Sequence, residues 1–169
     1  MKEIQLTQGK VALVDDEDFA MIAKHKWFAA RHCRTFYAGR NVCRPDGKWT
    51  TEDMHRVILA CKLDRALAKG EQTDHENGNG LDNQRENLRP ATNAQNGRNC
   101  RRRNGSPSSQ YLGVQWNKWA KKWRAQIRIS NKPFHLGYYP TELSAAQARE
   151  TYVLAHPELM ARLNFPPNQ

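Results

Sequence analysis

The chain has 169 residues, of which 38% are hydrophobic, and its mean hydropathy is −0.89. This composition argues against one large core and favours small modules in series. The formal net charge is +10 and the pI is near 9.7. Such a charge favours a polyanionic partner such as nucleic acid, with a merely solvated basic surface as the alternative. No apolar stretch approaches the length of a membrane span, so we expect no membrane partner.

The positive charge is unevenly distributed along the chain. Residues 1–70 carry a net charge of +4, residues 71–103 of +1 and residues 104–169 of +5. A nearly neutral middle segment is expected if that segment holds a cation. The two flanks would then supply the attraction to a polyanion.

Cysteine usage gives no sign of a structural metal site. The four cysteines are Cys33, Cys43, Cys61 and Cys100, and no Cys-x-x-Cys pair occurs. A zinc site of the common type is therefore not expected. Met1–Gln5 opens no apolar run, so we expect no signal peptide. We therefore expect the thiols to be reduced, as in a cytoplasm.

The first elements are a strand and a short helix. Lys10–Val14 is an apolar run bounded by a glycine and an acidic cluster, which predicts a strand. Asp15 or Asp16 can cap a helix with Phe19 and Ile22 on one face. The acids at the start of this helix are explained better by capping and by the helix dipole than by a metal site.

Paired strands are expected next. Trp27–Ala30 and Thr35–Ala38 predict two such strands, flanked by arginines that suit either phosphate contact or a solvated face. Pro45–Lys48 has clear turn chemistry, and Trp49–Asp53 predicts the last strand. We expect residues 1–50 to form a small β-rich module.

A second helix follows at Met54–Lys62. Its pattern predicts that Val57, Ile58 and Cys61 face inward.

The segment from Asp74 to Asn96 packs a carboxylate, an imidazole and several amides into a short space. It begins at the end of a strand, and Asn77–Asn83 predicts a turn because Gly and Asn tolerate positive φ. Leu88–Ala91 can form a short strand. Thr92 can cap a helix whose first turns carry Asn96. The predicted unit is strand, long loop, strand and helix.

This spacing resembles the HNH nuclease motif, the ββα-metal fold, in the branch found in phage and intron-encoded homing endonucleases. The residues that carry the resemblance are Asp74-His75, Asn77-Gly78, Asp82-Asn83, Asn87-Leu88-Arg89, Thr92 and Asn96. The last ligand position, often His in HNH enzymes, is Asn here, as in some homing-enzyme members. The resemblance implies an HNH core within residues 51–103 and, if the chain is phage-encoded, the cytoplasm of a bacterial host.

The roles implied by the resemblance fit phosphodiester hydrolysis. His75 is the general base, since imidazole has an unperturbed pKa suited to deprotonating water near neutral pH. Asp74 and Asn96 are the metal ligands, and two oxygen ligands suit one Mg²⁺ or Mn²⁺ with room for water and phosphate. Asn87 holds the loop and helps to orient the histidine. Asp74 and His75 should point to opposite sides of their strand unless the strand twists at its end.

Basic segments flank this motif on both sides. His55-Arg56 matches a His-Arg pair that related nucleases often carry upstream, and we expect a structural or phosphate-contacting role for it rather than metal binding. Arg101, Arg102 and Arg103 close the helix, where cations suit the dipole, and can lie along a DNA backbone. Residues 104–110 are polar and rich in Gly, Ser and Pro, which predicts a flexible linker.

Residues 111–166 predict a three-stranded sheet followed by a helix. Strands are expected at 111–116, 123–129 and 134–139, and the middle strand alternates strictly between apolar and polar residues. The helix should run from about Thr141 or Ser144 to Ala155, and Ser144 with Gln147 fits a capping box.

This segment resembles the APETALA-type ethylene-response-factor domain of plants, which also occurs fused to phage HNH nucleases. The residues that carry the resemblance are Tyr111-x-Gly113-Val114, Trp123-x-Ala125-x-Ile127-Arg128, Leu136-Gly137-x-Tyr139 and Leu163-Asn164-Phe165-Pro166. In that family the sheet lies in the major groove and reads bases.

The matching positions imply DNA contacts for one set of side chains. These are Gln115, Asn117, Trp119, Gln126, Arg128 and His135, and Arg124 shares their face. Gln115 and Asn117 stand where the family has arginines, so the base preference should differ. Core packing is the alternative for the tryptophans; we expect it for Trp123 and DNA contact for Trp119.

The sequence thus predicts an α+β chain with a β-rich module (1–50), an HNH ββα-metal nuclease (51–103), a linker (104–110) and an APETALA-type DNA-binding domain (111–166). The expected activity is cleavage of double-stranded DNA with Mg²⁺ or Mn²⁺. One catalytic motif per chain implies that a monomer nicks, whereas a double-strand cut requires a weak homodimer or a second visit. The alternatives are a non-catalytic DNA-binding regulator with an inactive nuclease motif, and a nuclease that acts on RNA.

Overall fold

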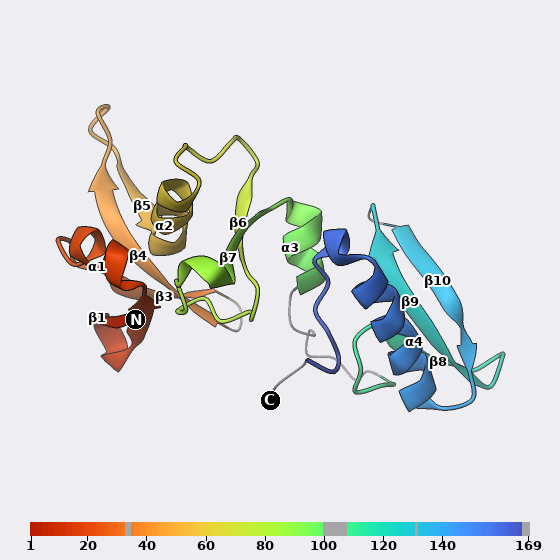
Figure 1. Ribbon diagram of the computed structural model, residues 1–169. Helices are drawn as coiled ribbons and strands as arrows, with labels where there is room; N and C mark the ends of the chain where they lie inside the picture. Colours follow the sequence, from red (N-terminus) through yellow and green to blue (C-terminus); the bar gives the residue numbers. More distant parts are fainter. Residues whose placement is uncertain (33–34, 100–107, 131, 167–169) are drawn as a thin grey trace. The chain divides into compact units, whose positions relative to one another are not determined.

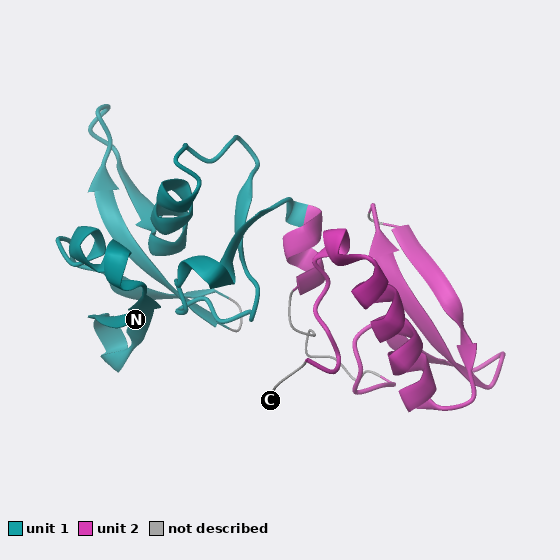
Figure 2. Ribbon diagram, in the orientation of Figure 1, with its two compact units in different colours: residues 1–93 teal, residues 94–169 magenta. Residues whose placement is uncertain are grey.

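The computed structural model describes residues 1–32, 35–99, 108–130 and 132–166. The chain is α+β, as predicted, and divides into two compact units, residues 1–93 and 94–169 (Figure 2). The boundary lies inside the segment 51–103 that the sequence predicts as one nuclease domain. Residues from the predicted modules 1–50 and 51–103 belong to a single core in unit 1, which is why the two do not separate.

Unit 1 contains three small antiparallel sheets and two α-helices among its described residues (Figure 1). The elements are β1 (Lys2–Gln5), β2 (Val11–Val14), α1 (Asp16–Ile22), β3 (Phe28–His32), β4 (Thr35–Cys43), β5 (Trp49–Asp53), α2 (Met54–Lys62), β6 (Gln72–His75) and β7 (Leu88–Ala91). Short 3-10 turns lie at Thr7–Gly9 and Arg85–Asn87. The sheets are β1–β2, β3–β4–β5 and β6–β7.

Most of the strands and helices predicted for this unit are confirmed, but β1 was not foreseen. It pairs with β2 and buries Ile4. Because Ile4 is its one buried residue, the local pattern carries too little apolar signal to indicate a strand. The partner strand β2, by contrast, buries Ala12 and Val14.

Helix α2 supplies the centre of the unit 1 core. Met54, Ile58 and Leu59 are fully buried in it. The prediction that Cys61 faces inward is wrong: it is exposed, and its Sγ lies 3.7 Å from Met21 Sδ. The buried stripe of α2 instead includes Leu59, because β4, β5, β6 and β7 all contact this short helix.

Unit 2 contains a three-stranded antiparallel sheet with a helix packed on one face (Figure 1). Its elements are α3 (Asn93–Asn99), which starts at the unit boundary, β8 (Val114–Asn117), β9 (Lys122–Ile129), β10 (Lys132–Tyr139), α4 (Glu142–Ala155) and a 3-10 turn at Pro157–Leu159. The strand order is β10-β9-β8. Both the sheet and the helix were predicted.

Two details of unit 2 differ from the prediction. Helix α4 is capped by Thr141, which forms a reciprocal capping box with Ser144 in place of the predicted Ser144–Gln147 pair. The predicted linker is also partly structured: Ser108 Oγ accepts from the amide of Trp116, and the amide of Gln110 donates to Glu142. Residues 104–107 lie outside the described part of the chain.

Gly113 is required where the chain enters β8. Its φ is +71°, and a Cβ at this position would lie 2.4 Å from Gln126 O and 2.7 Å from Arg149 Cδ. Both the backbone conformation and the space therefore exclude a side chain. The absence of a side chain leaves room here for the buried Arg149, which donates to Arg162 O.

No helix in the described ranges is long and apolar enough to cross a membrane.

Candidate active site

The β6–β7 hairpin positions the predicted catalytic residues. Asp74 pairs with Arg89 across the hairpin, and His75 pairs with Leu88. Neighbours on a strand point to opposite faces and cross-strand partners share a face. His75 therefore shares the core side with the buried Leu88, while Asp74 lies on the side of Arg89. This is the opposed arrangement that the sequence predicts.

Asp74 is held by an arginine that sequence reasoning did not single out. Its side chain is buried, and its Oδ2 accepts from both Nε and an Nη of Arg89 at 2.9 Å each. The same guanidinium lies 3.6 Å from Glu76. The ion pair offsets the desolvation of the carboxylate. Arg89 stands in the Asn-Leu-Arg run of the motif, which was the available signal.

His75 is buried, with 4% of its surface exposed, and its Nε2 lies 3.3 Å from Asn83 Oδ1. Burial lowers the pKa of His75, whereas the hydrogen bond to Asn83 and the charges of Asp74 and Asp82 act to raise it. The net shift is downward, so the imidazole is neutral near pH 7 and able to accept a proton.

Two rings lie beside His75, and a third extends the cluster. The His75 ring centroid lies 5.2 Å from that of His55 and 5.6 Å from that of Tyr37, and Tyr37 in turn lies 5.8 Å from His32. These rings come from α2, β4 and β3, which are separated in sequence from the motif. Nothing in the local sequence marks Tyr37 as a neighbour of the histidine.

His55 is enclosed in this cluster of rings. Burial, together with the nearby His75, Arg56 and His32, lowers its pKa to about 3. It is therefore neutral near pH 7, and its 4.0 Å contact with Asp53 is not an ion pair there. Burial also raises the pKa of Asp53. His55 Nδ1 has no hydrogen-bond partner within the described ranges.

Arg56 lies on the neighbouring position of α2. It donates to the carbonyl oxygen of Glu71, just before β6. This contact ties α2 to the chain that leads into Asp74, which is consistent with the structural role expected for the His-Arg pair.

The loop between β6 and β7 is braced by amide side chains. Asn87 Oδ1 accepts from the amide of Asn77, and Asn87 Nδ2 donates to Asp82 O at 2.7 Å. The buried Asn87 therefore contacts both arms of the loop, the geometry expected if it holds the loop. Asn87 thus bonds to the loop backbone, whereas Asn83, which the prediction omits, bonds to the His75 ring itself.

Gly80 lets the loop approach the β3–β4 hairpin. A Cβ at this position would lie 2.5 Å from Phe36 O and 2.6 Å from Tyr37 Cε1. The amide of Gly80 donates to Thr35 Oγ1. A residue with a side chain would push the loop away from Tyr37 and hence from the ring cluster around His75.

Asn96 and the arginine cluster lie outside this hairpin. Asn96 is half-buried on α3 and belongs to unit 2, whereas Asp74 belongs to unit 1. Arg101, Arg102 and Arg103 fall outside the described residues.

The donor chemistry of Asp74 and Asn96 suits a hard divalent cation, because both side chains offer oxygen. Within the described ranges no three His, Cys, Asp or Glu side chains form a metal-binding group.

The sheet of unit 2 has one polar face. Strand register places Gln115, Arg124 and Tyr138 in one row and Gln126 beside His135 in the next. We call the polar face the set Gln115, Asn117, Lys122, Arg124, Gln126, Arg128, His135 and Tyr138. The opposite face is buried against α4 through Val114, Ala125 and Ile127. All the predicted DNA-contacting residues of the strands lie on the polar face.

Tyr138, which the prediction omits, reaches this face because of a bulge. The register shifts between His135 and Gly137, so Tyr138 pairs with Arg124 and Tyr139 turns inward. The rings of His135 and Tyr138 then lie 4.6 Å apart. Strict alternation along β10 gives the opposite orientation.

Two side chains that are predicted to contact DNA already form hydrogen bonds within unit 2. Asn117 Oδ1 accepts from the amides of Trp119 and Ala120, and its Nδ2 donates to Tyr138, so Asn117 shapes the turn after β8. Gln115 accepts from Arg124 at 2.7 Å, which orients that guanidinium. Trp119 is 97% exposed at the tip of the turn, whereas Trp123 packs in the core as expected.

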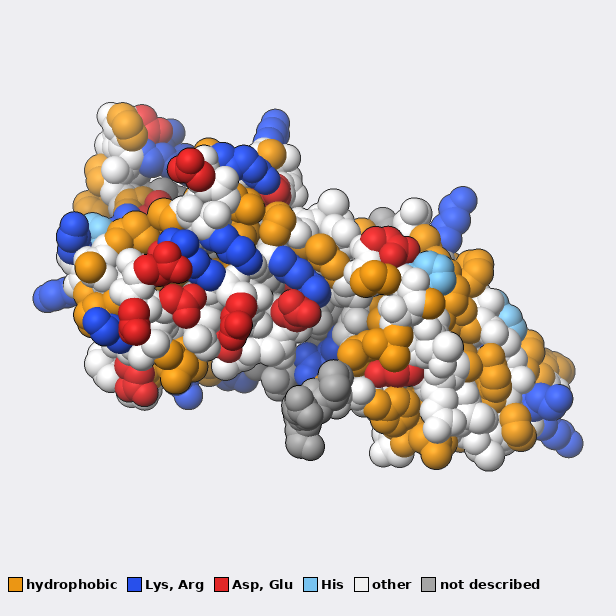
Figure 3. All heavy atoms as spheres, viewed as in Figure 1, with side chains coloured by type: hydrophobic (Ala, Val, Ile, Leu, Met, Phe, Trp, Pro, Cys, Tyr) orange, Lys and Arg blue, Asp and Glu red, His pale blue; other side chains and the backbone are white. Residues whose placement is uncertain are grey.

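The charged side chains differ between the two units on the face drawn in Figure 3. On unit 1, Lys and Arg alternate with Asp and Glu, so this face carries no patch of a single sign. On unit 2, the same view shows mainly hydrophobic and uncharged side chains over α4. The basic residues Lys118, Lys121, Lys122, Arg124, Arg128 and Lys132 come instead from the sheet strands and the β8–β9 turn.

Comparisons with protein-family models, curated proteins and solved structures found no match to this chain.

Proposed function

We propose that this protein is a metal-dependent endonuclease that cuts one phosphodiester of double-stranded DNA. The observation that carries the proposal is that a buried imidazole and a buried carboxylate occupy consecutive positions at the end of β6, where a network of amides holds the neighbouring loop. A neutral imidazole is suited to take a proton from water near pH 7.

Residue roles follow from this arrangement. His75 is the general base. Asp74 and Asn96 would hold the cation, and a bound Mg²⁺ or Mn²⁺ supplies charge stabilisation at the phosphate oxygens. Asn87 keeps the loop closed by bonding to both of its arms.

The polar face of unit 2 would bring the catalytic hairpin to its substrate. It combines two arginines, a histidine, amides and a tyrosine, which are side chains that contact phosphates and base edges. Tethering this face to the nuclease raises the local concentration of target DNA. One catalytic motif per chain favours nicking.

One observation favours a second function, a non-catalytic DNA-binding regulator. Both donors of the Arg89 ion pair go to Asp74 Oδ2, the carboxylate on which the cation would depend. If Arg89 never releases this oxygen, the motif is inactive and the polar face alone acts.

Incubation of supercoiled plasmid with wild type and His75→Ala tests the proposal. We expect open-circle product from wild type with Mg²⁺ or Mn²⁺, none with EDTA, and none from His75→Ala. Linear product would indicate a dimer or paired cuts. Tight duplex binding without cleavage in either metal, on DNA that carries the gene region of the protein, would instead support the regulator. A competition between duplex DNA and RNA decides the substrate class.

A further inference from the structure

Asn83 is buried without exposed surface in the loop between β6 and β7. Its backbone is fixed by strand β2, because its amide donates to Leu13 O and the amide of Leu13 donates to Leu81 O, each at 2.8 Å. Leu13 and Asp82 form an isolated β-bridge between these bonds. The position of Asn83 therefore depends on backbone pairing rather than on its own side chain.

The orientation of the Asn83 amide is set by its two neighbours. Its Nδ2 lies 3.3 Å from Leu81 O, and a carbonyl oxygen can only accept, so the NH₂ group must face Leu81. Its Oδ1 then faces His75 Nε2, at 3.3 Å. An amide oxygen is also an acceptor only, which means that Nε2 of His75 carries the hydrogen.

This assignment defines which nitrogen of His75 is basic. A neutral imidazole carries one hydrogen, and with Nε2 protonated the lone pair is on Nδ1. Asn83 thus supplies an acceptor for the Nε2 hydrogen of a ring that lies beside His55 and Tyr37.

We infer that Asn83 is a positioning residue that holds His75 in the Nε2–H form, so that Nδ1 is the nitrogen that takes the proton from the attacking water. This inference rests on the proposed nuclease function. Asn83 does not touch the substrate and acts through the imidazole alone. Its role differs from that of Asn87, which holds the loop by bonding to its backbone.

The test uses two substitutions at this position in the full chain. Asn83→Leu has a similar volume but no acceptor, so the hydrogen bond to Nε2 is lost. Asn83→Asp keeps an oxygen that can accept from Nε2, although the bond to Leu81 is lost. Gln84→Ala is the matched control, because the Gln84 side chain bonds to Asp15 in the same loop and does not contact His75.

Three measurements are made on each variant: the single-turnover rate of plasmid nicking, the Kd for duplex DNA, and the ¹⁵N spectrum of the histidine rings. His75→Ala identifies the His75 signals. We expect Asn83→Leu to nick about 10²-fold more slowly with an unchanged Kd, because general-base catalysis is worth about 10²–10⁴-fold. In Asn83→Leu, the ¹⁵N spectrum of His75 should no longer show the Nε2–H form alone. In Asn83→Asp, the Nε2–H spectrum and most of the nicking rate should be restored.

The outcomes separate the inference from the proposed function. If wild type nicks DNA and Asn83→Leu nicks equally fast with an unchanged ring signature, Asn83 is only a loop residue and the inference is overturned. The same follows if Gln84→Ala slows nicking as much as Asn83→Leu does. If wild type fails to nick, the nuclease proposal falls and Nδ1 has no role as a base, while the ring spectra still decide whether Asn83 sets the tautomer.

Discussion

His55 is one residue whose ionisation is changed strongly by folding. Its ordinary pKa is 6.5, and burial among the other rings lowers it to about 3. Between these two values the unfolded chain binds a proton that the folded chain excludes. The stability that depends on neutral His55 is therefore complete above pH 6.5 and is lost as the pH falls towards 3.

A pH-dependent stability difference follows for His55→Phe. Phenylalanine keeps a ring beside Tyr37 and His75 but cannot be protonated. The difference in the free energy of unfolding between the variant and wild type should shift in favour of the variant by about 1.4 kcal/mol for each pH unit below the ordinary histidine pKa. Urea unfolding of both proteins near neutral pH and at about pH 5.5 measures this. A constant difference between the two proteins at the two pH values would show that His55 is not buried in its neutral form.

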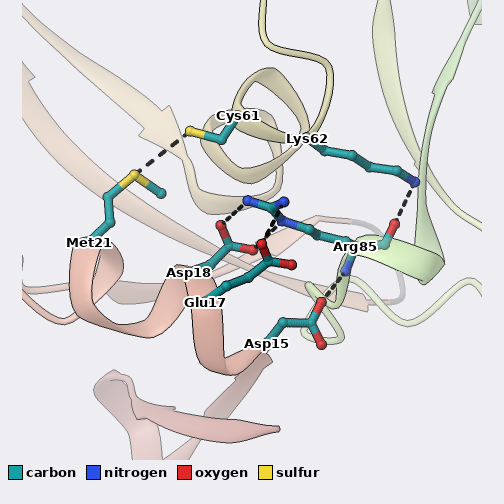
Figure 4. A network of polar contacts seen from close by, with 7 residues as sticks. All are labelled: Asp15, Glu17, Asp18, Met21, Cys61, Lys62 and Arg85. Atoms are coloured by element: carbon teal, nitrogen blue, oxygen red, sulfur yellow. Dashed lines mark hydrogen bonds and ion pairs between the residues drawn. The ribbon is translucent and has the colours of Figure 1, made fainter.

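At the scale of elements, a network of charges joins α1 to the turn before β7 (Figure 4). Arg85 donates to both oxygens of Asp18 at 2.8 Å and lies 2.9 Å from Glu17. Asp15 accepts from the amide of Arg85 and from Gln84. The expected capping is not found, since Asp15 occupies the N-cap position of α1 but makes no side-chain capping bond, whereas the expected dipole complementarity agrees with the acids in the first turn of α1. Asp15, Glu17 and Asp18 also hold α1 against Gln84 and Arg85.

Removal of Arg85 should destabilise unit 1. Asp18 is only 2% exposed, so Arg85→Gln leaves a buried carboxylate without its cation. We expect a loss of about 2 kcal/mol, below the 3–5 kcal/mol of fully buried pairs because the Arg85 side chain is partly exposed. Urea unfolding provides the measurement, and Asp18→Asn combined with Arg85→Gln should recover part of the loss.

A matched control is available in Arg65→Gln. Arg65 makes the same bidentate contact to Glu71, at 2.9 Å for each bond, but on the surface. Its removal should change stability much less than Arg85→Gln does, because water screens an exposed ion pair. Equal effects of the two substitutions would contradict the role given to the buried network.

The whole molecule contains two units, each with its own core. The core of unit 1 gathers side chains from Ile4 to Leu88, and unit 2 has two adjoining clusters centred on Ala125 and Ile127. The charge also differs between them: residues 1–93 carry 15 Lys or Arg against 14 Asp or Glu, a net +1, whereas residues 94–169 carry 12 against 3, a net +9. This distribution supports the proposed division of roles, in which unit 2 attracts DNA and unit 1 cuts it.

The salt dependence of DNA binding tests this division. Arg128 is exposed on the polar face, and each phosphate contact that is lost should reduce the slope of log K against log salt by about 0.9. We expect this reduction for Arg128→Gln and an unchanged slope for Lys69→Gln, an exposed change in unit 1. Fluorescence anisotropy over a range of salt measures both. A larger effect of Lys69→Gln would place the DNA contact on unit 1.

The sequence by itself determined most of the elements and the residues that gather at the β6–β7 hairpin. Some of the signals were local: the alternation along β9, the apolar run of β2 and the turn residues of the loop that follows β6. The structure has strands β9, β2 and β6 at these places. The order of Asp74, His75 and Asn87 likewise indicated which residues gather at one hairpin. Local signals suffice in these cases because backbone hydrogen bonding and side-chain periodicity act over a few residues.

Only the tertiary structure decided which side chains meet. Asp15 and Arg85 are 70 positions apart, and Tyr37 reaches His75 from another sheet. It also decided that Cys61 is exposed, and that the first 93 residues form one unit. These features depend on how separate elements pack against one another. A local pattern records the period of a strand or helix, whereas burial and ion pairing depend on the surfaces that the other elements bring to it.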